Sequence, residues 1–387
     1  MLFRDRLLER IKNKIDSDLK YFFLKESEEI DTTLEKYLPS SFFHYYLSSG
    51  EGVYFDTTLD WFTSLLKELR LAKRFIFLEF FSIAPGIMWE EIFVILKEKR
   101  KQGVEVRIIY DNLVSAKKLP PHFASSLNEI GILCQPYYQK CHLMGTLHNR
   151  HLHRKVVIID GAIAFTGGMN IGDEYLNLIR PYGDFKDVGV SFKGHAVWGF
   201  TVMFLSFWNA ITSSREDYWK YYFKTNSEEK GKYCVYGDNP LGTSFISEEV
   251  FSSLIGDAKN TCFIYTPYFL PPKKIRDALI KAARRGVEIK IILPGVPDKK
   301  IIYFFSRLYA FFLRGKNIQF YFYQEGFIHG KVILIDDKIA SVGNVNLDYY
   351  SLHYNFEYNI LIHDQRLIND IKQDMINILN CPNLSKK

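Results

Sequence analysis

The sequence has few cysteines and no pattern that would pair them. Five cysteines occur in 387 residues, an odd number without regular spacing. Domains that depend on disulfides use cysteine more densely and in even sets. The first residues, MLFRDRLLERIKNK, also lack the apolar core and the small-residue cleavage site of a secretory signal. These absences exclude a disulfide framework and favour a reducing compartment.

Long hydrophobic runs are missing as well. The longest run, residues 196–211, is interrupted by Thr201, Ser206 and Asn209. A helix needs about 20 consecutive apolar residues to cross a bilayer. We therefore expect this run to form a packed core helix, and we expect no membrane span.

Metal-ligand patterns are also absent. The chain contains no Cys-x2-Cys pair, no His-Glu-x2-His sequence and no acidic cluster with the spacing of a magnesium site. The sequence therefore predicts chemistry that uses neither a metal nor another cofactor.

One pattern, in contrast, is present twice. The order His-x-Lys-x4-Asp-x6-Gly-x2-Asn begins at His153 and again, 176 residues later, at His329. Its members are His153, Lys155, Asp160, Gly167 and Asn170 in the first copy, and His329, Lys331, Asp336, Gly343 and Asn346 in the second. One copy would be a weak match. Two copies with identical spacing are not expected from unrelated surface histidines.

Each copy lies in a pair of short apolar runs. VVIID precedes AIAFTGG in the first copy, and VILID precedes IASVG in the second. Short β-branched runs separated by Asp-Gly or Asp-Asp predict a hairpin of buried strands. On a strand, residues i and i+2 point to one face. The histidine and lysine of each copy are therefore expected to face the same pocket.

The duplication extends upstream of the two motifs. Residues 97–112 resemble residues 281–295, each with a basic helix end, a glycine that can cap it (Gly103, Gly286) and a buried strand. FIFLEFFSIAPG and FIYTPYFLPP precede these segments. Each half thus predicts an α/β fold with a mixed, mostly parallel sheet flanked by helices. Two such halves should form an internal pseudo-dimer with both histidines at the interface.

The expected organisation has four parts. They are an amphipathic N-terminal segment (1–50), the first half (51–211), a polar and charged linker (212–233) and the second half (234–387).

The residue types at the interface suit a phosphate diester. One imidazole can attack phosphorus, while the other protonates the leaving alkoxide and then activates the incoming hydroxyl. Both lysines, together with Asn170 and Asn346, would hold the non-bridging oxygens. Asp160 and Asp336 complete the catalytic motif. They follow four apolar strand residues, so we expect them to be structural or to pair with lysine rather than to act as acid or base.

The chain resembles the phospholipase D superfamily and, within it, the bacterial cardiolipin synthases. The resemblance runs from about residue 50 to 370. It rests on HRKVVIIDGAIAFTGGMNIGDEYL (153–176), TPYFLPP (266–272), ARRGVEIKIILPG (283–295) and GFIHGKVILIDDKIASVGNVNLDYYSLHYNFEYNILIHD (326–364). The twin motifs are specific to the superfamily, and the last segment points to the synthase branch.

The resemblance implies a metal-independent transfer in two steps, in which two phosphatidylglycerols give cardiolipin and glycerol. His153 would be the nucleophile, and His329 the general acid and base. A carboxylate should lie behind each histidine to fix its tautomer. By position, Asp187 matches for the first half and Glu357 for the second.

Two alternatives stay open. One is hydrolysis, or transfer to another acceptor, on another lipid. The other is a nucleic-acid phosphodiesterase. Proteins of that kind interleave basic and stacking aromatic residues along a groove, whereas the aromatics of this chain cluster in apolar runs. We therefore expect no nucleic-acid partner.

The chain departs from the family at two positions. Family copies often have Gly-Ser or Gly-Thr where this chain has Gly167-Gly168 and Gly343-Asn344. A backbone amide of Gly168 and the side chain of Asn344 would then remain as phosphate donors. His151 is an additional histidine, expected to be a strand neighbour of His153 or exposed, with a phosphate contact as the alternative.

A lipid enzyme without membrane spans must dock on an anionic phospholipid membrane. Many bacterial cardiolipin synthases begin with two membrane helices, so integral anchoring of this chain would require residues upstream of Met1. We expect a peripheral protein on the cytoplasmic face, in keeping with a net charge of +6.

Two segments are candidates for docking. In residues 1–23, an apolar stripe lies beside a basic one; the stripe is Leu8, Ile11, Ile15, Leu19 and Phe22, and the basic residues are Arg4, Arg6, Arg10, Lys12 and Lys14. In residues 299–315, aromatic residues are flanked by Lys and Arg. Packing against the protein is the alternative for both segments.

Overall fold

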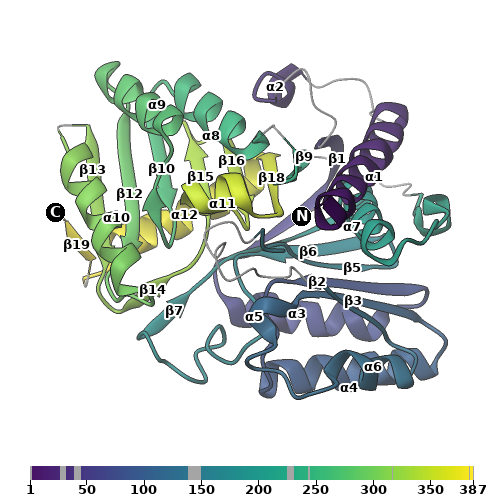
Figure 1. Cartoon of the computed structure of the whole chain (residues 1–387). Coiled ribbons are helices and arrows are strands. Elements are labelled where there is room, and N and C mark those ends of the chain that lie inside the picture. Colours follow the sequence, from purple (N-terminus) through teal and green to yellow (C-terminus); the bar gives the residue numbers. More distant parts are fainter. Residues whose placement is uncertain are drawn as a thin grey trace.

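A single sheet runs through both halves of the molecule. The computed structural model describes residues 2–26, 32–38, 45–137, 150–224, 231–242, 245–315, 317–382 and 384–386. Its main sheet has 15 strands in the order β19-β13-β12-β10-β15-β16-β18-β9-β1-β8-β6-β5-β2-β3-β4 (Figure 1).

The two sides of this sheet correspond strand by strand. From the middle outward, the first half contributes β1 (Tyr45–Phe55), β8 (Gly189–Lys193), β6 (Ile163–Gly167), β5 (Lys155–Ile159), β2 (Phe75–Phe80), β3 (Glu105–Asp111) and β4 (Leu133–Tyr137). The second half contributes β9 (Gly231–Asp238), β18 (Glu357–His363), β16 (Ile339–Gly343), β15 (Val332–Ile335), β10 (Thr261–Tyr265), β12 (Glu288–Pro294), β13 (Ile318–Tyr323) and the edge strand β19 (Leu384–Lys386). The predicted α/β fold of two similar, paired halves is confirmed.

The strand directions correct one part of that prediction. Within the main sheet, parallel pairing is confined to β2, β3 and β4 on one side and to β10, β12 and β13 on the other. Every pairing between these two groups is antiparallel. Parallel neighbours need a long crossover, usually a helix, and along the chain a helix lies between the members of each parallel pair of this sheet. The motif strands follow one another through tight turns, so the sheet is mostly antiparallel.

Helices cover both faces of the sheet. They are α1 (Leu2–Glu26), α2 (Thr32–Glu35), α3 (Thr58–Leu71), α4 (Ile87–Lys101), α5 (Asn112–Ser115), α6 (Phe123–Glu129), α7 (Ala196–Thr212), α8 (Ile246–Asp257), α9 (Lys273–Arg284), α10 (Lys300–Leu313), α11 (Tyr349–Tyr354) and α12 (Gln365–Leu379), with a 3-10 turn at Tyr218–Tyr221. The glycines expected to cap α4 and α9, Gly103 and Gly286, have φ of 88° and 97°. Glycine adopts this left-handed conformation without steric cost.

The layers follow from the alternation of side chains along the strands. On β5, Val156 and Ile158 enter the core beneath α7 and α12, which continues across both halves. Val157 and Ile159 enter the opposite core, beneath α3 and α4. A third core lies beneath α8 and α9 in the second half. Because the strands are buried on both faces, their sequences are continuous apolar runs.

The expected domain limits fall inside ordered elements. β1 crosses the limit at residue 50 and pairs with β8 of the first half and β9 of the second. The segment 212–233 contains the 3-10 turn and the first residues of β9, and residues 225–230 lie outside the described residues. β1 therefore joins the two halves within the sheet.

The apolar run of residues 196–211 forms α7, whose residues from Ala196 to Ala210 are buried. This is the packed core helix that the sequence predicts. Within the described ranges, no helix combines the length and the hydropathy that a bilayer crossing requires.

α1 packs on α7 with its apolar stripe turned inward. Ile11, Ile15, Leu19 and Phe22 are all buried. Phe22 stacks on Tyr218, with ring centroids 4.3 Å apart. The stripe is therefore not available to a bilayer, and the packing alternative is the correct one for residues 1–23. The side chains of Arg4, Arg6, Leu8 and Arg10 lie outside the described residues.

The motif aspartates hold the ends of the motif strands. Asp160 (φ 57°) accepts hydrogen bonds from the backbone N–H groups of residues 73–75, at 2.7–2.9 Å. Asp336 (φ 51°) accepts from those of residues 259–261, at 2.7–2.8 Å. Each aspartate thus ties its hairpin turn to the start of the neighbouring strand, β2 or β10. These contacts agree with the expected structural role of Asp160 and Asp336. They do not agree with the alternative, in which the aspartates pair with lysine side chains.

The packing of α1 leads to a prediction about stability. Leu19→Ala should lower the free energy of unfolding by about 2–4 kcal/mol, because it leaves a cavity against α7. Binding to vesicles should not change. Urea unfolding and vesicle flotation measure the two effects. Ser17→Ala, on the exposed face of α1, is the control and should change stability by less than about 0.5 kcal/mol. A Leu19 variant of unchanged stability that no longer floats would contradict this packing role.

Candidate active site

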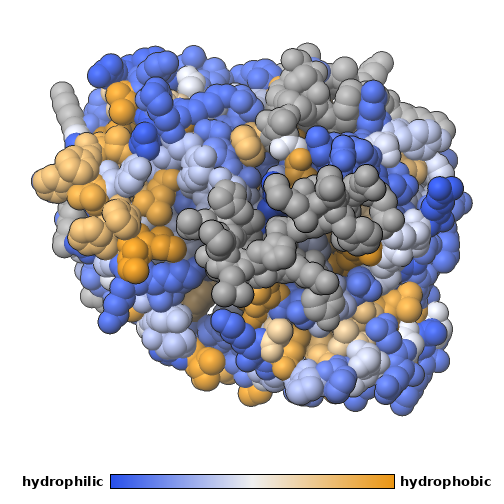
Figure 2. Space-filling view, viewed as in Figure 1, coloured by the Kyte–Doolittle hydropathy of each residue, from blue (hydrophilic) through white to orange (hydrophobic). Residues whose placement is uncertain are grey.

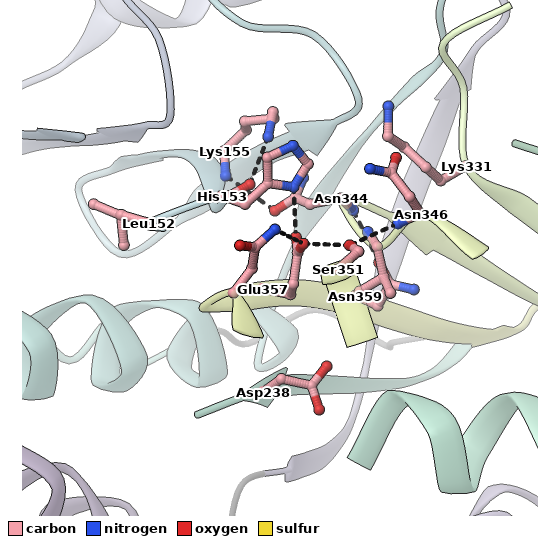
Figure 3. A network of polar contacts seen from close by, with 12 residues as sticks. Leu152, His153, Lys155, Asp238, Lys331, Asn344, Asn346, Ser351, Glu357 and Asn359 are labelled. Atoms are coloured by element: carbon pink, nitrogen blue, oxygen red, sulfur yellow. Dashed lines mark hydrogen bonds and ion pairs between the residues drawn. The ribbon is translucent and has the colours of Figure 1, made fainter. Parts of the chain in front are cut away.

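His153 is held by residues of the second half. Its backbone N–H donates to the carbonyl of Phe356 at 2.9 Å. Its ring Nδ1 lies 2.8 Å from Oε2 of Glu357 (Figure 3). The bridge between Leu152 and Phe356 aligns the two segments. The side chain is buried, and the ring packs edge-on against Phe81 with centroids 4.8 Å apart.

His329 is held in the same way by residues of the first half. Its backbone N–H donates to the carbonyl of Lys186 at 2.7 Å, and its Nδ1 lies 2.6 Å from Oδ2 of Asp187. The parallel pair of β7 (Asp184–Lys186) and β14 (Gly326–Ile328) aligns these segments. In both cases, the residue before the carboxylate holds the histidine backbone and the carboxylate holds the ring.

This arrangement exchanges the carboxylates that the sequence had assigned to each half. Asp187 serves the histidine of the second half, and Glu357 serves the histidine of the first. The exchange follows from the cross-half pairings, because each brings a histidine beside the opposite half's carboxylate. A carboxylate at Nδ1 fixes the tautomer that leaves Nε2 as the free ring nitrogen.

The pKa values of the two histidines are both low. Burial lowers the pKa of His153 well below 6.5, and the charges of Lys155 and Lys331 lower it further. Burial and then Lys331 lower the pKa of His329 to about 4, although Asp187 opposes them. Both imidazoles are therefore neutral at pH 7 in the free protein. A neutral imidazole has the lone pair that a nucleophile or a base requires.

The carboxylates differ from one another. Burial works to raise the pKa of Asp187, but His329, Lys331 and a backbone N–H outweigh it, and the pKa is lowered. Burial raises the pKa of Glu357 against the opposing effects of Lys155, Ser351 and Asn355. Asp187 is thus more readily ionised than Glu357. Its partner His329 is therefore the better placed of the two histidines to carry a proton.

The motif lysines lie behind the histidines. The ammonium of Lys155 donates to the carbonyl of His153, and that of Lys331 donates to the carbonyl of His329. Burial lowers the pKa of Lys331 to about 8 and that of Lys155 well below 10.5. Neither lysine is among the residues that line the cavity. Both lysines are therefore at the site, beside the histidine carbonyls. They do not line the cavity, although the i and i+2 spacing predicts that they face it with the histidines.

A cavity of about 460 Å³ opens onto both histidines. Asn170 and Asn346 line it as well. Asn170 donates to the hydroxyl of Tyr175 at 2.6 Å and accepts from the backbone N–H of Ser82 at 3.1 Å. The side-chain oxygen of Asn346 is buried without a hydrogen-bond partner among the described residues. The motif residues that meet at the cavity are thus the two histidines and the two asparagines.

Asp160 and Asp336 are not among the residues that line this cavity. They follow the far ends of β5 and β15, whereas the histidines precede these strands. A strand therefore separates each aspartate from its histidine, and the two aspartates lie apart from the cavity.

The two positions that depart from the family have structural tasks. A Cβ added to Gly168 would lie 2.2 Å from Oδ1 of Asp187, and the Gly168 N–H already donates to the Val188 carbonyl at 3.2 Å. Asn344 accepts from the N–H of Lys155 at 2.9 Å and donates to the carbonyl of Gly167. Asn344 therefore links the two motif hairpins (Figure 3), and neither position is free to bind phosphate.

The structure places His151, for which a phosphate contact was the alternative, at the cavity, and it adds Asp111, Asp298 and Lys299, which the sequence did not indicate as site residues. His151 lines the cavity, and its Nδ1 lies 3.0 Å from Oδ2 of Asp111 at the end of β3. Asp298 and Lys299, between β12 and α10, line it too. Asp111 has no repeated counterpart, because Pro294 ends β12. Comparing the two halves could not have found it.

In the described part of the chain, His, Cys, Asp and Glu side chains form no group of three or more that could hold a metal ion. The absence of a cofactor stays a prediction.

Known proteins resemble this chain in sequence and in fold. A family profile described as "Cardiolipin synthase, PLD-like domain" matches residues 65–180 and 251–379. A relative from Streptococcus mutans, described as an uncharacterized protein, is 36% identical over 354 residues, covering 91% of this chain and 76% of that protein. Cardiolipin synthase 2 of Bacillus anthracis is 33% identical over 324 residues, covering 81% of this chain. The chain spans 62% of that synthase's length.

A solved structure gives the same fold. The crystal structure of phosphatidylserine synthase from Haemophilus influenzae is similar with a TM-score of 0.67 and 14% identity. The similarity covers 88% of this chain and 89% of that one. At this identity the likeness concerns the fold alone. Because the family profile matches more than half of the chain and a named relative exceeds 30% identity, this chain belongs to the phospholipase D superfamily, in its cardiolipin synthase branch.

Proposed function

We propose that the protein is a phosphatidyltransferase that converts two phosphatidylglycerols into cardiolipin and glycerol. The observation that carries the proposal is the pair of buried, neutral histidines on one cavity, each with a carboxylate of the opposite half at Nδ1. Two imidazoles of this kind can supply a nucleophile and a proton carrier to the same phosphate.

In the first step, Nε2 of His153 attacks the phosphorus of one phosphatidylglycerol. The bond between phosphorus and the glycerol headgroup breaks, and His329, which takes up a proton when the anionic lipid binds, gives this proton to the departing oxygen. Free glycerol and a phosphatidyl group on His153 result. We assign the proton-donating role to His329 because its partner Asp187 is more readily ionised than Glu357, the partner of His153.

In the second step, the headgroup hydroxyl of another phosphatidylglycerol approaches the same phosphorus. His329, now neutral, removes the hydroxyl proton, and the oxygen attacks. The bond between phosphorus and Nε2 of His153 breaks, which releases cardiolipin and restores both histidines. The protein gains and loses no atoms over the cycle.

The charged groups around the histidines would stabilise the transition states. Each motif lysine has N–H groups left after its bond to the histidine carbonyl, and both are close enough to affect the histidines electrostatically. Asn170 and Asn346 lie on the cavity wall. Donors fixed in a buried site need no reorganisation when negative charge builds on phosphate oxygens.

A membrane lipid as substrate agrees with the names of the relatives, which are cardiolipin synthases from several bacteria. It also implies that the protein works as a peripheral protein on an anionic membrane, for which we propose the cytoplasmic face. Phosphatidylglycerol supplies the anionic headgroup, and no nucleic acid is required.

The assay follows the lipid products. Wild-type protein incubated with phosphatidylglycerol vesicles should form cardiolipin and free glycerol in equal amounts, detected by mass spectrometry. His153→Ala and His329→Ala should each lower turnover by about 10³-fold or more, because nucleophile and proton carrier are lost. EDTA should have no effect.

His363→Ala is the matched control for this assay. This histidine lies at the far end of β18 from Glu357, and its loss should leave turnover unchanged. Phosphatidic acid as the sole product would make the protein a hydrolase. Unchanged lipids with a wild-type fold would contradict lipid transfer and direct attention to nucleic acid.

The low pKa values predict that anion binding takes up protons. A phosphate between the histidines and lysines raises the pKa of His329 from about 4 and that of Lys331 from about 8. Protons are therefore bound, not released, when inorganic phosphate enters at pH 6–8. Calorimetry in buffers of different ionisation heats measures this uptake. At pH 6, His329→Gln should reduce it, and proton release by the wild type would contradict the assignment.

A further inference from the structure

α10 presents its large apolar side chains to the outside. Six of them are exposed, and we call them the docking face: Ile301, Phe304, Phe305, Leu308, Phe311 and Phe312. Ile301 and Phe312 are 74% and 73% exposed. Figure 2 shows the resulting orange and pale-orange surface at the left of the molecule, where Figure 1 places α10. A contiguous patch of this kind marks an interaction site.

The buried side of α10 explains why the helix lies this way. Only Ser306 and Ala310 are buried in it. The Ser306 hydroxyl accepts a hydrogen bond from the backbone N–H of Phe269, in the short strand β11 (Phe269–Leu270), at 3.1 Å. Small residues thus attach the helix, and aromatic ones point outward. This is the reverse of a surface helix in a soluble domain, whose apolar stripe faces the core, and the reverse of α1.

The charged residues of the segment that carries the docking face are all basic. Residues 299–315 contain Lys299, Lys300, Arg307 and Arg314 and no Asp or Glu. Arg307 and Arg314 line a hollow of about 140 Å³ beside Phe311. Among the described residues, neither arginine has an ion-pair partner within 4.0 Å. Arg314 is exposed and Arg307 is half-buried. Guanidinium groups beside aromatic rings suit a surface with apolar chains below and phosphates above.

The docking face is continuous with the cavity. Lys299 and Ile302, at the start of α10, line the cavity that contains both histidines. A bilayer against the outer face of α10 therefore brings its headgroups to the cavity mouth. A lipid phosphate could enter while its acyl chains stay in the membrane.

We propose that α10 docks on an anionic bilayer and positions the cavity mouth against the headgroups. The inference rests on the proposed function in one respect, that the substrate is a membrane lipid. A second copy of the chain is a poorer occupant. A symmetric dimer through this face would bring the basic residues of both copies together without an acidic partner on the segment.

The test compares full-length variants in flotation with vesicles. The triple variant Ile301→Ser, Phe304→Ser and Phe312→Ser should bind mixed phosphatidylglycerol–phosphatidylcholine vesicles about 100-fold more weakly than wild type, since three exposed apolar side chains no longer insert. The matched control carries Leu71→Ser, Val94→Ser and Ile130→Ser, which are also exposed apolar residues. It should float like wild type. Lys300→Gln with Arg314→Gln should weaken binding to anionic vesicles about tenfold and leave binding to phosphatidylcholine alone unchanged.

A soluble substrate separates this proposal from the proposed function. On dihexanoyl phosphatidylglycerol below its micelle concentration, the triple variant should turn over like wild type, while its turnover on vesicles falls. Absence of turnover by every form would count against the proposed function and leave the flotation result standing. Wild-type flotation by the triple variant, equal loss in the control, or a wild-type dimer that the triple variant converts to monomer would each overturn the docking assignment.

Discussion

The exchange of carboxylates between the halves is the constraint on which the site depends. Glu357 fixes the ring of His153 and Asp187 fixes that of His329, and in each case the preceding residue binds the histidine backbone. Neither half can orient its own histidine. The site therefore exists only when the halves are paired, and the sheet provides this through β1 and β9 at its centre. Asn344 and the pair of β7 and β14 add further links across the same interface.

Burial of these pairs sets the chemistry. Removing charged groups from water disfavours their charged forms, so the histidines are neutral and the lysines have lowered pKa values. In the free site, both histidines thus stay unprotonated until an anion binds. A phosphate diester would then be the group that completes its charge balance. Gly168 leaves room for the Asp187 carboxylate, because a side chain at this position would collide with it.

Much of the fold and of the site could be predicted from the repeat itself. Two identical spacings indicate two similar halves and place His153 and His329 at their interface, and Gly103 and Gly286 mark the helix ends. The direction of the strands could not be predicted from the sequence, because buried strands of parallel and antiparallel sheets have similar apolar runs. The partner of each histidine depends on cross-half pairing, which sequence position does not encode. Periodicity likewise shows an apolar face on α1 and on α10, but it does not show what covers each face. α7 covers the apolar face of α1, whereas the described residues cover little of that of α10.

A burst experiment with His329→Ala and phosphatidyl-p-nitrophenol tests most directly how His153 and His329 divide the chemistry. This leaving group needs no proton, so the first step should proceed, whereas the second step lacks its base. We expect one p-nitrophenolate released per protein and a phosphatidyl group on His153, located by mass spectrometry after rapid quenching. Continued turnover without an adduct, or an adduct on another residue, would contradict the assignment of His153 and His329.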